Sequence, residues 1–241
     1  MWKGERPQPA SSRNAKRAAA VRISRVLNTF RRPGLGAYTD PMYAPDHFRE
    51  DRPEVLRDGI RNIALATLVT HAGGQIEANH LPMLLDGDRL YGHFARANPV
   101  WKTLAPGAEV LAIFLGPHFY TSPNWYPSKQ LSGKGVPTWN YISVHVRGRI
   151  TLHDDADWLR AHVGALSHEH ERGRATPWKP EDAPGDYIQA LLKAIVGYEI
   201  AITSMEGKWK LGQNRPAGDG EGIRQALIAE GRPDLAGLIR S

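Results

Sequence analysis

Hydrophobic and polar positions follow two different periods along the chain. Up to residue 152, the apolar residues form short runs that are β-branched or alternate with polar residues, and turns such as Gly73-Gly74 separate them. This pattern predicts strands joined by hairpins. The predicted strands cover residues 63–70, 76–85, 89–95, 109–115 and 141–152.

Beyond residue 152 the apolar residues recur at helical spacing. Asp154 or Asp155 is a favourable N-cap, and Leu159, Val163 and Leu166 then share one helix face. A mainly β (α+β) fold follows, with a small antiparallel barrel and peripheral helices rather than a parallel sheet. The remaining predicted elements are helices at 53–60, 100–104, 155–172, 185–196, 221–229 and 233–240, and a last strand at 198–205.

The positive charge of the chain is confined to its first part. The sequence has 31 Lys or Arg and 25 Asp or Glu, a net charge of +6. Residues 1–41 hold nine of the basic and two of the acidic side chains, which leaves 22 basic and 23 acidic residues in 42–241. The body of the protein is therefore neutral, and its charge does not favour direct DNA binding.

Composition divides the chain into a leader, residues 1–41, and one folded domain, residues 42–241. The leader is rich in Arg and Ser and poor in acidic residues, which resembles an organellar transit peptide. The alternatives are a disordered basic tail, or a natural start at Met42. There is no secretory apolar region and no apolar run long enough to span a membrane, so we expect a cytoplasmic protein.

Residues 91–102 form a candidate anion site. This segment, YGHFARANPVWK, ends a predicted strand and turns into a short helix. Arg96, Asn98 and Lys102 could converge there with the free backbone N–H groups of the helix start. The alternative is a solvated loop whose basic side chains point outward.

Three later segments are candidates for binding a ring ligand. Residues 116–126, GPHFYTSPNWY, place four aromatic residues in a predicted loop, which could line a flat ligand, face a second subunit, or fold over the core. In residues 136–141, VPTWNY, Trp139 could stack on a heteroaromatic ring while Asn140 bonds its edge. Residues 207–216 add Lys208, Lys210, Gln213, Asn214 and Arg215, or else form a polar loop after an edge strand.

The sequence gives no support for a metal site. It lacks cysteine, which excludes thiolate ligands and disulfides. His168 and His170, in HEHE, are two positions apart and do not share a helix face, so a solvated helix end is the better interpretation.

Seven segments, in order, resemble a known family. Together they span residues 42–241 and are similar to the FMN-binding negative transcriptional regulator family of the PaiB type, which belongs with the flavin-reductase and pyridoxamine-phosphate-oxidase-like proteins. The resemblance implies an antiparallel Greek-key FMN-binding split barrel that forms a homodimer, with FMN in two clefts at the subunit interface. The segments are MYAPDHF (42–48), ATLVT (66–70), NHLPMLLD (79–86), GHFARANP (92–99), FLGPHFYTSPNWY (114–126), VPTWNY (136–141) and KWKLGQNRP (208–216).

The same resemblance implies which residues contact FMN. Residues 79–82 would run beside the flavin ring and ribityl chain, residues 93–102 would hold the ribityl and phosphate groups, and the others would approach the ring, Trp139 and Asn140 from the partner subunit. Gly212 stands where the family pattern has Ser, which removes one hydroxyl. The implied FMN residues are Asn79, His80, Leu81, Pro82, His93, Ala95, Arg96, Asn98, Lys102, Trp139, Asn140, Lys210, Gln213 and Asn214.

Three functions remain open at this level. The first is an FMN-binding negative transcriptional regulator that senses redox state or works through a partner, since residues 42–241 contain no helix-turn-helix pattern. The second is an FMN-dependent oxidoreductase acting on a small molecule, with His80, Trp139 and Asn140 positioning it over the flavin. The third is a structural dimer with an empty flavin site. No residue is marked by the sequence as a catalytic acid or base.

Overall fold

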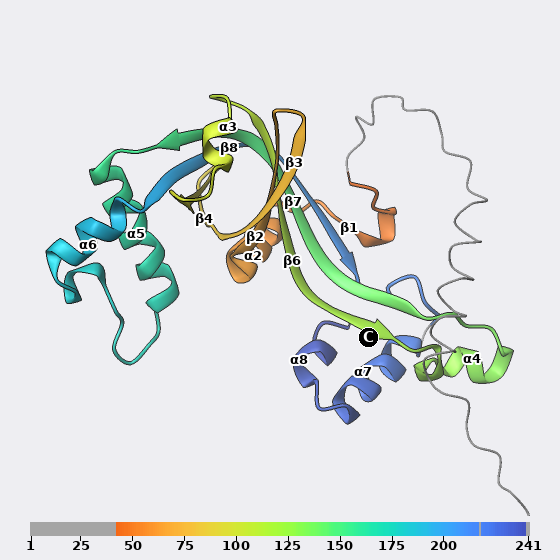
Figure 1. Cartoon of the computed structure of the whole chain (residues 1–241). Coiled ribbons are helices and arrows are strands. Elements are labelled where there is room, and N and C mark those ends of the chain that lie inside the picture. Colours follow the sequence, from red (N-terminus) through yellow and green to blue (C-terminus); the bar gives the residue numbers. More distant parts are fainter. Residues whose placement is uncertain (1–41, 217, 240–241) are drawn as a thin grey trace, which may run out of the picture. The chain divides into compact units, whose positions relative to one another are not determined.

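A computed structural model describes residues 42–216 and 218–239 of the chain (Figure 1). The leader predicted over residues 1–41 lies outside the described residues. The strands are β1 (Arg49–Glu50), β2 (Leu65–Ala72), β3 (Gln75–Pro82), β4 (Leu84–Asp86), β5 (Arg89–Ala95), β6 (Glu109–Thr121), β7 (Thr138–His153) and β8 (Ile195–Lys210). The α-helices are α2 (Pro53–Ile63), α3 (Val100–Thr103), α4 (Pro127–Ser132), α5 (Ala156–Glu171), α6 (Gly185–Leu192), α7 (Asp219–Ala229) and α8 (Pro233–Ala236), and the 3-10 turns are η1 (Asp46–Phe48), η2 (Pro123–Trp125) and η3 (Pro180–Asp182).

The strands form one antiparallel sheet in the order β3-β2-β6-β7-β8-β5-β4, with β1 paired to β8. The last strand in the chain, β8, is therefore an interior strand. The sheet curls so that its two ends approach one another. A hydrogen bond of 2.7 Å shows this closure: Nδ2 of Asn98, just after β5, donates to Oδ1 of Asn79 on β3. This arrangement confirms the predicted antiparallel split barrel with peripheral helices.

The barrel encloses the main hydrophobic core. Alternation along β2, β5 and β6 sends every second side chain inward, as the period of two requires. Leu68, Phe94, Phe114 and Tyr198 are fully buried there. Helix α2 adds Leu56 and Ile60 to the same core, and Pro53 at its first turn suits a helix start.

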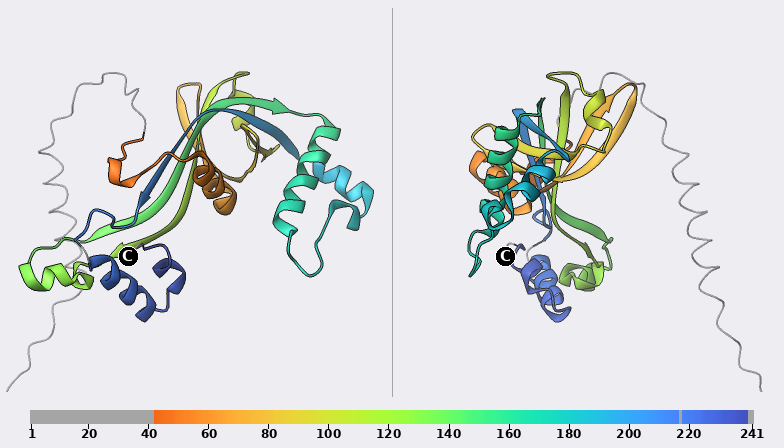
Figure 2. Two further views of the ribbon diagram at one scale, coloured as in Figure 1. Left: turned by 180° about the vertical axis from the view of Figure 1, so that it is seen from behind. Right: turned by 60° about the vertical axis from the view of Figure 1, so that its left-hand side comes forward.

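The long strands β6, β7 and β8 continue beyond the barrel into a second part, which we call the arm (Figures 1 and 2). The arm comprises residues 116–142, 207–216 and 218–239, and α4, α7 and α8 lie beside its strands (Figure 2). It has its own small core, in which Phe119 and Ile142 pack against Ile223 and Leu227 of α7. The arm is therefore a packed structure rather than a loop.

Three predicted element boundaries were wrong in the arm. Residues 116–121, predicted as loop, belong to β6, and residues 138–140 begin β7 before the predicted start. The strand predicted to end at 205 continues to Lys210, so residues 207–210 are interior strand and not a loop after an edge strand. A bulge between Leu115 and His118 lets β6 continue through Gly116-Pro117, which sequence reasoning took as its end.

The helical region was predicted more closely. Asp155 is the N-cap of α5, and its side chain accepts hydrogen bonds from the N–H groups of Asp157 and Trp158. Helix α6 ends at Leu192, before the predicted end at 196, because β8 already begins at Ile195. Within the described parts of the chain, no helix combines the length and the apolar character needed to cross a bilayer.

Candidate functional site

The sequence-predicted FMN residues on the barrel gather around the end of β3. Thr67 on β2 and His80 on β3 are cross-strand partners, and Thr67 Oγ1 lies 3.0 Å from Nδ1 of His80. On the opposite face, Asn79 accepts the hydrogen bond from Asn98, whose own Oδ1 accepts from the N–H of Val100. These contacts hold the 96–99 turn against β3.

Two further predicted residues extend this strand end. Leu81 is half-buried against the main core and Pro82 is half-buried at the last position of β3. Ala95 is exposed at the end of β5. Asn79 Nδ2 is buried and has no hydrogen-bond partner in the described structure, so this corner retains one unsatisfied donor. We call Asn79–Pro82, Ala95, Asn98 and Lys102 the barrel group.

Arg96 does not form the open phosphate cradle that the sequence predicted. Its Nε donates to the carbonyl of Lys193 (2.6 Å), and its Nη2 donates to the carbonyl of Ile195 (2.8 Å) and to Asp154. Its Nη1 also donates to Asp154, at 3.1 Å. The hydrogen bonding from Arg96, and then its positive charge, lower the pKa of the Asp154 carboxyl. Arg96 therefore fastens the loop before α5 to the start of β8, and at most one of its five N–H groups remains for a phosphate.

Lys102 keeps its charge available. It is exposed on α3, and its Nζ lies 5.4 Å from the centroid of the Trp101 ring. Arg96 lies 5.9 Å from the same ring, and Trp101 Nε1 donates to the carbonyl of Arg96. Trp101 thus brings the two predicted phosphate residues together, but only Lys102 is without a carboxylate partner among the described residues.

His93, another implied FMN residue, contacts helix α5. Its Nδ1 is 3.0 Å from Nε2 of His162 on α5, so its ring faces that helix instead of the 96–99 turn. The Trp158 ring stacks between His153, at a centroid distance of 4.3 Å, and His162, at 5.3 Å. Sequence reasoning missed this stack, although Trp158 and His162 are four residues apart and so share a helix face.

The His93–His162 pair makes stability depend on pH. Burial, and then the neighbouring His93, lower the pKa of His162 from 6.5 to about 4. The unfolded chain therefore binds more protons than the folded protein between about pH 6.5 and about pH 4, and stability is lost as the pH falls through this range. We expect the melting temperature of His162→Gln to fall less over this range than that of the wild type. An equal fall, measured by circular dichroism, would contradict this role.

The remaining predicted residues lie on the arm. Trp139 is 55% exposed and pairs across the strands with Tyr120, at a ring centroid distance of 6.2 Å. Asn140 faces the other way and is fully buried, and its Nδ2 donates to Thr121 Oγ1 at 2.7 Å. Lys210 Nζ donates to Thr138 Oγ1 at 2.7 Å.

Gln213 has a local structural role. Its Oε1 accepts from the N–H of Leu211 and its Nε2 donates to the carbonyl of Trp209, so the side chain folds back on its own turn. Gly212 in this turn has a φ of +85°, a backbone conformation that favours glycine over residues with a side chain. Asn214 is exposed after the turn and lines a cavity with Asn140 and Lys210. We call Trp139, Asn140, Lys210 and Asn214 the arm group.

The barrel group and the arm group do not meet within one chain. Asn79 pairs with Leu68, and Leu68 pairs with Ala112 on β6, whereas Asn140 pairs with Phe119 on the same strand. Ala112 and Phe119 are seven positions apart on β6, but because of the bulge their partners on β7 are only six positions apart, which corresponds to roughly 20 Å at ~3.3 Å per residue. The structure therefore brings the predicted site residues together as two halves.

A metal site receives no support from the structure. His168 and His170 lie in the last turn of α5. Over residues 42–216 and 218–239, no three His, Asp or Glu side chains form a group that could hold a metal ion.

Solved structures with the same fold bind flavins. The FAD and heme binding protein from Mycobacterium smegmatis is 20% identical, with a TM-score of 0.52 over 67% of this chain and 73% of that one. The flavocytochrome Anf3 from Azotobacter vinelandii is 15% identical, with a TM-score of 0.51 over 67% and 69% of the two chains. The protein thus has the split-barrel fold of these proteins.

Sequence comparison gives the family. The family model described as "Putative FMN-binding domain" matches residues 42–204. The chain is 32% identical over 197 residues to the protease synthase and sporulation protein PAI 2 of Bacillus subtilis, covering 80% of this chain and 92% of that protein. It is 31% identical to an uncharacterized protein of Emericella nidulans, covering 76% and 88%. The chain belongs to this FMN-binding family, and FMN is its cofactor.

The residues present fit FMN. Amide and imidazole groups on β3 suit the polar edge of a flavin, Lys102 suits a phosphate, and the exposed Trp139 suits an aromatic ring. Asn79 leaves one buried polar atom without a partner in the described structure, as expected of a group that a ligand completes.

Proposed function

We propose that the protein is a homodimeric FMN-binding regulator in which each flavin cleft combines the barrel group of one protomer with the arm group of its partner. The observation that carries this proposal is the separation of the two groups along β6, which leaves each half incomplete in a single chain. In a twofold dimer, each arm can reach the barrel of the other protomer, and both clefts are completed by the same contact.

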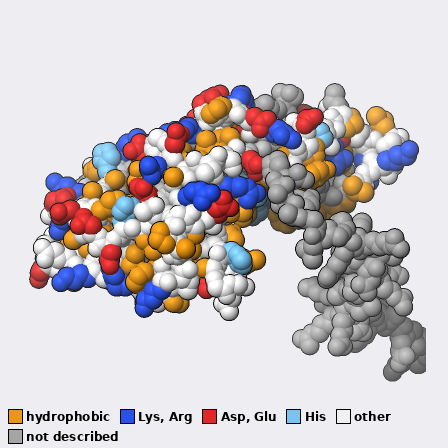
Figure 3. All heavy atoms as spheres, turned by 90° about the horizontal axis from the view of Figure 1, so that it is seen from above, with side chains coloured by type: hydrophobic (Ala, Val, Ile, Leu, Met, Phe, Trp, Pro, Cys, Tyr) orange, Lys and Arg blue, Asp and Glu red, His pale blue; other side chains and the backbone are white. Residues whose placement is uncertain are grey.

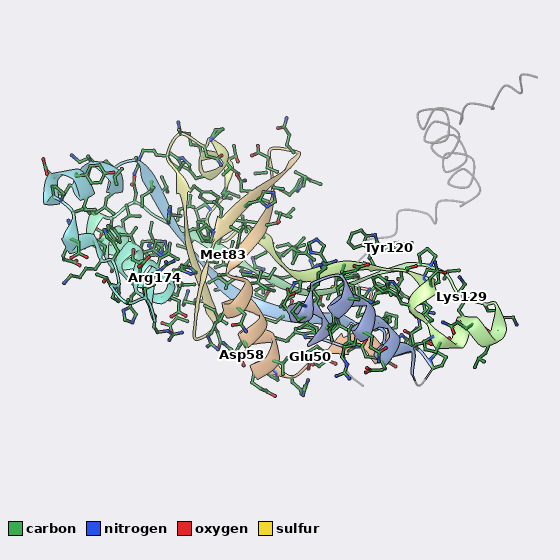
Figure 4. The ribbon with its side chains drawn as sticks, turned by 90° about the horizontal axis from the view of Figure 1, so that it is seen from below. Glu50, Asp58, Met83, Tyr120, Lys129 and Arg174 are labelled. Carbon is green, nitrogen blue, oxygen red and sulfur yellow. The ribbon has the colours of Figure 1, made fainter. Side chains whose placement is uncertain are left out.

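The exposed surface of the arm supports a dimer. Tyr120 and Trp139, which are cross-strand neighbours, are each about half exposed, and Tyr120 projects from β6 in the arm (Figure 4). Large apolar groups gathered on one surface are typical of protein interfaces. Stable interfaces bury ~1,600 Å² or more in total, so a dimer of this kind requires more of the surface than these two side chains.

Each half has a distinct task in this arrangement. Lys102 holds the phosphate, the 96–99 turn and β3 fix the ribityl chain and the ring edge, and Trp139 of the partner covers the ring and excludes water. The bound flavin supplies redox chemistry, while the protein contributes binding, orientation and electrostatics.

Regulation through redox state or a protein partner suits this protein better than direct reading of DNA. The related PAI 2 is described as a protease synthase and sporulation protein, which is consistent with a regulatory role. Residues 42–241 are close to neutral, and basic and acidic side chains are interspersed on the face shown in Figure 3. DNA binding of the usual kind requires a concentrated basic surface.

FMN and riboflavin titrations test the barrel half. Loss of one charge-assisted hydrogen bond costs ~1.5–3 kcal/mol, so Lys102→Ala should weaken FMN roughly 10- to 100-fold. Riboflavin lacks the phosphate and should be almost unaffected. Arg96→Ala should weaken both ligands alike and lower the melting temperature, because Arg96 holds Asp154 and β8.

The outcome is measured by flavin fluorescence on the full chain, together with the sedimentation coefficient. The proposal expects one FMN per protomer and a dimer at micromolar concentration. A monomer that binds FMN with full affinity would rule out the shared cleft. An equal loss of FMN and riboflavin affinity in Lys102→Ala would rule out the assignment of Lys102 to the phosphate.

A further inference from the structure

The arm contains a small basic cavity. It has a volume of about 210 Å³ and lies where β7 and β8 meet the 211–216 turn and α7. Its polar lining comes from Tyr126, Thr138, Asn140, Lys210, Asn214 and Arg215. A complete small-molecule site usually occupies ~300–1,000 Å³, so this cavity suits one end of a ligand rather than a whole flavin.

The positive charges in this cavity are not neutralised. Lys210 donates to the hydroxyl of Thr138, and Arg215 lies 4.2 Å from the centroid of the Tyr126 ring, with a long 3.5 Å contact from Nη2 to the carbonyl of Val136. Neither forms an ion pair with a carboxylate among the described residues. Burial, and then the nearby Lys208 and Arg215, lower the pKa of Lys210, as expected for a cation without a counter-charge.

The acidic side chain next to this region is already engaged. Asp219 is fully buried at the start of α7. Its two carboxylate oxygens accept from the N–H of Ser128, at 3.0 Å, and from its hydroxyl, at 2.7 Å. Burial, and to a smaller extent the charge of Asp219, raise the pKa of Tyr126. The Asp219 oxygens accept hydrogen bonds from Ser128 of α4 and form no ion pair with Lys210 or Arg215.

Two buried polar residues of the cavity lining lack a full set of partners. Asn140 and Tyr126 are each 1% exposed, and both Asn140 Oδ1 and the Tyr126 hydroxyl have no partner in the described structure. Buried polar groups are rarely left in this state unless water, an ion or a ligand completes them. Thr121 Oγ1, the partner of the Asn140 amide, can donate as well as accept, so the amide can present either its oxygen or its NH₂ group.

We propose that this cavity, the arm pocket, binds the phosphate or carboxylate group of a small molecule other than FMN. Lys210 and Arg215 supply the charge, and Thr138, Asn140 and Asn214 supply neutral hydrogen bonds. The position of this oxyanion beside a flavin rests on the proposed function, because Trp139 and Asn140 belong to the arm group. The oxyanion site itself lies within one chain and does not depend on the flavin.

Calorimetric titration of the flavin-free full chain with inorganic phosphate, at constant ionic strength in chloride, tests the site. Arg215→Gln and Lys210→Gln should each weaken phosphate at least about tenfold, the loss of one charge-assisted hydrogen bond. Lys129→Gln removes the same charge from α4, where Lys129 Nζ contacts only Asn124 Oδ1 among the described residues, and is the matched control. Its phosphate affinity should stay within about twofold of the wild type.

The flavin titrations separate this site from the FMN phosphate site. FMN and riboflavin should bind Arg215→Gln and the wild type equally. No saturable phosphate binding, or an equal loss in Arg215→Gln and Lys129→Gln, would overturn the proposal. A selective loss of FMN in Arg215→Gln would also overturn it, because the pocket would then hold the FMN phosphate. If phosphate binds as expected while the wild type binds no flavin, the proposed function fails and the oxyanion site stands.

Discussion

Replacing Gly222 by Ala should destabilise the protein by about 3 kcal/mol, a large value for the addition of one methyl group. Gly222 lies in α7, where a Cβ would stand 2.1 Å from the carbonyl oxygen of Trp125 and 2.9 Å from Cδ of Pro127. The carbonyl belongs to the backbone and cannot rotate away, so α7 or the 123–127 segment has to shift. A fall of roughly 6–12 °C in melting temperature follows for a domain of this size.

Gly164→Ala is the matched control for this substitution. Gly164 is also inside a helix, α5, but nothing lies within 4 Å of the position its Cβ would take. Helix propensity alone favours Ala by up to ~1 kcal/mol, so Gly164→Ala should be neutral or stabilising. If both variants changed the melting temperature equally, the close packing of α7 on Trp125 would be wrong. Because Tyr126 follows Trp125, Gly222→Ala should also weaken phosphate binding in the arm pocket.

Replacing Trp139 by Ala should weaken the dimer by at least about 30-fold. Large aromatic residues at the centre of an interface commonly contribute ~2 kcal/mol or more, and this energy corresponds to that change in the dissociation constant. The same variant should lose flavin affinity, since Trp139 covers the ring in the partner's cleft. Sedimentation equilibrium and flavin fluorescence measure the two effects.

Trp178→Ala separates this effect from the general loss of an exposed aromatic residue. Trp178 is 45% exposed, close to the 55% of Trp139, but it lies between α5 and η3, away from the arm. It should leave the dimer and the flavin affinity unchanged. A dimer that is equally stable in Trp139→Ala and the wild type would exclude the arm surface as the interface.

Local patterns in the sequence were sufficient to predict the barrel. The β-branched apolar run at 63–70 predicted a strand that the structure places at Leu65–Ala72, and the predicted strand at 89–95 keeps its bounds. The Asp155 cap before an apolar helical face is a further short-range signal that the structure retains. The extensions of β6 to Thr121 and of β8 to Lys210 were not predictable in this way, because pairing with β7 creates them. Gly116-Pro117 is a strong turn signal locally, and only the bulge seen in the sheet reconciles it with a strand.

The geometry of the candidate site depends on contacts between distant parts of the chain that the sequence does not indicate. The resemblance assigned Asn79 and Asn98 to one site without relating their side chains, and the structure joins them by a hydrogen bond. The sequence could not predict the contacts of Arg96, because its partner Asp154 lies 58 residues away and nothing near Arg96 in the sequence indicates the pairing. Gln213 was read as a ligand residue, but its contacts to Trp209 and Leu211 make it part of a turn. The assignment of the other residues to FMN remains a prediction.

A heterodimer experiment tests the shared cleft most directly. One chain carries Lys102→Glu, which disrupts the barrel half, and the other carries Trp139→Ala, which disrupts the arm half. The two chains are given different affinity tags and expressed together, and the heterodimers are isolated through both tags. Each homodimer should bind almost no FMN, whereas the heterodimer should bind about one FMN per dimer, because one of its two clefts pairs an intact barrel with an intact arm. Heterodimers without FMN, although both chains remain folded by circular dichroism, would contradict a cleft built from two protomers.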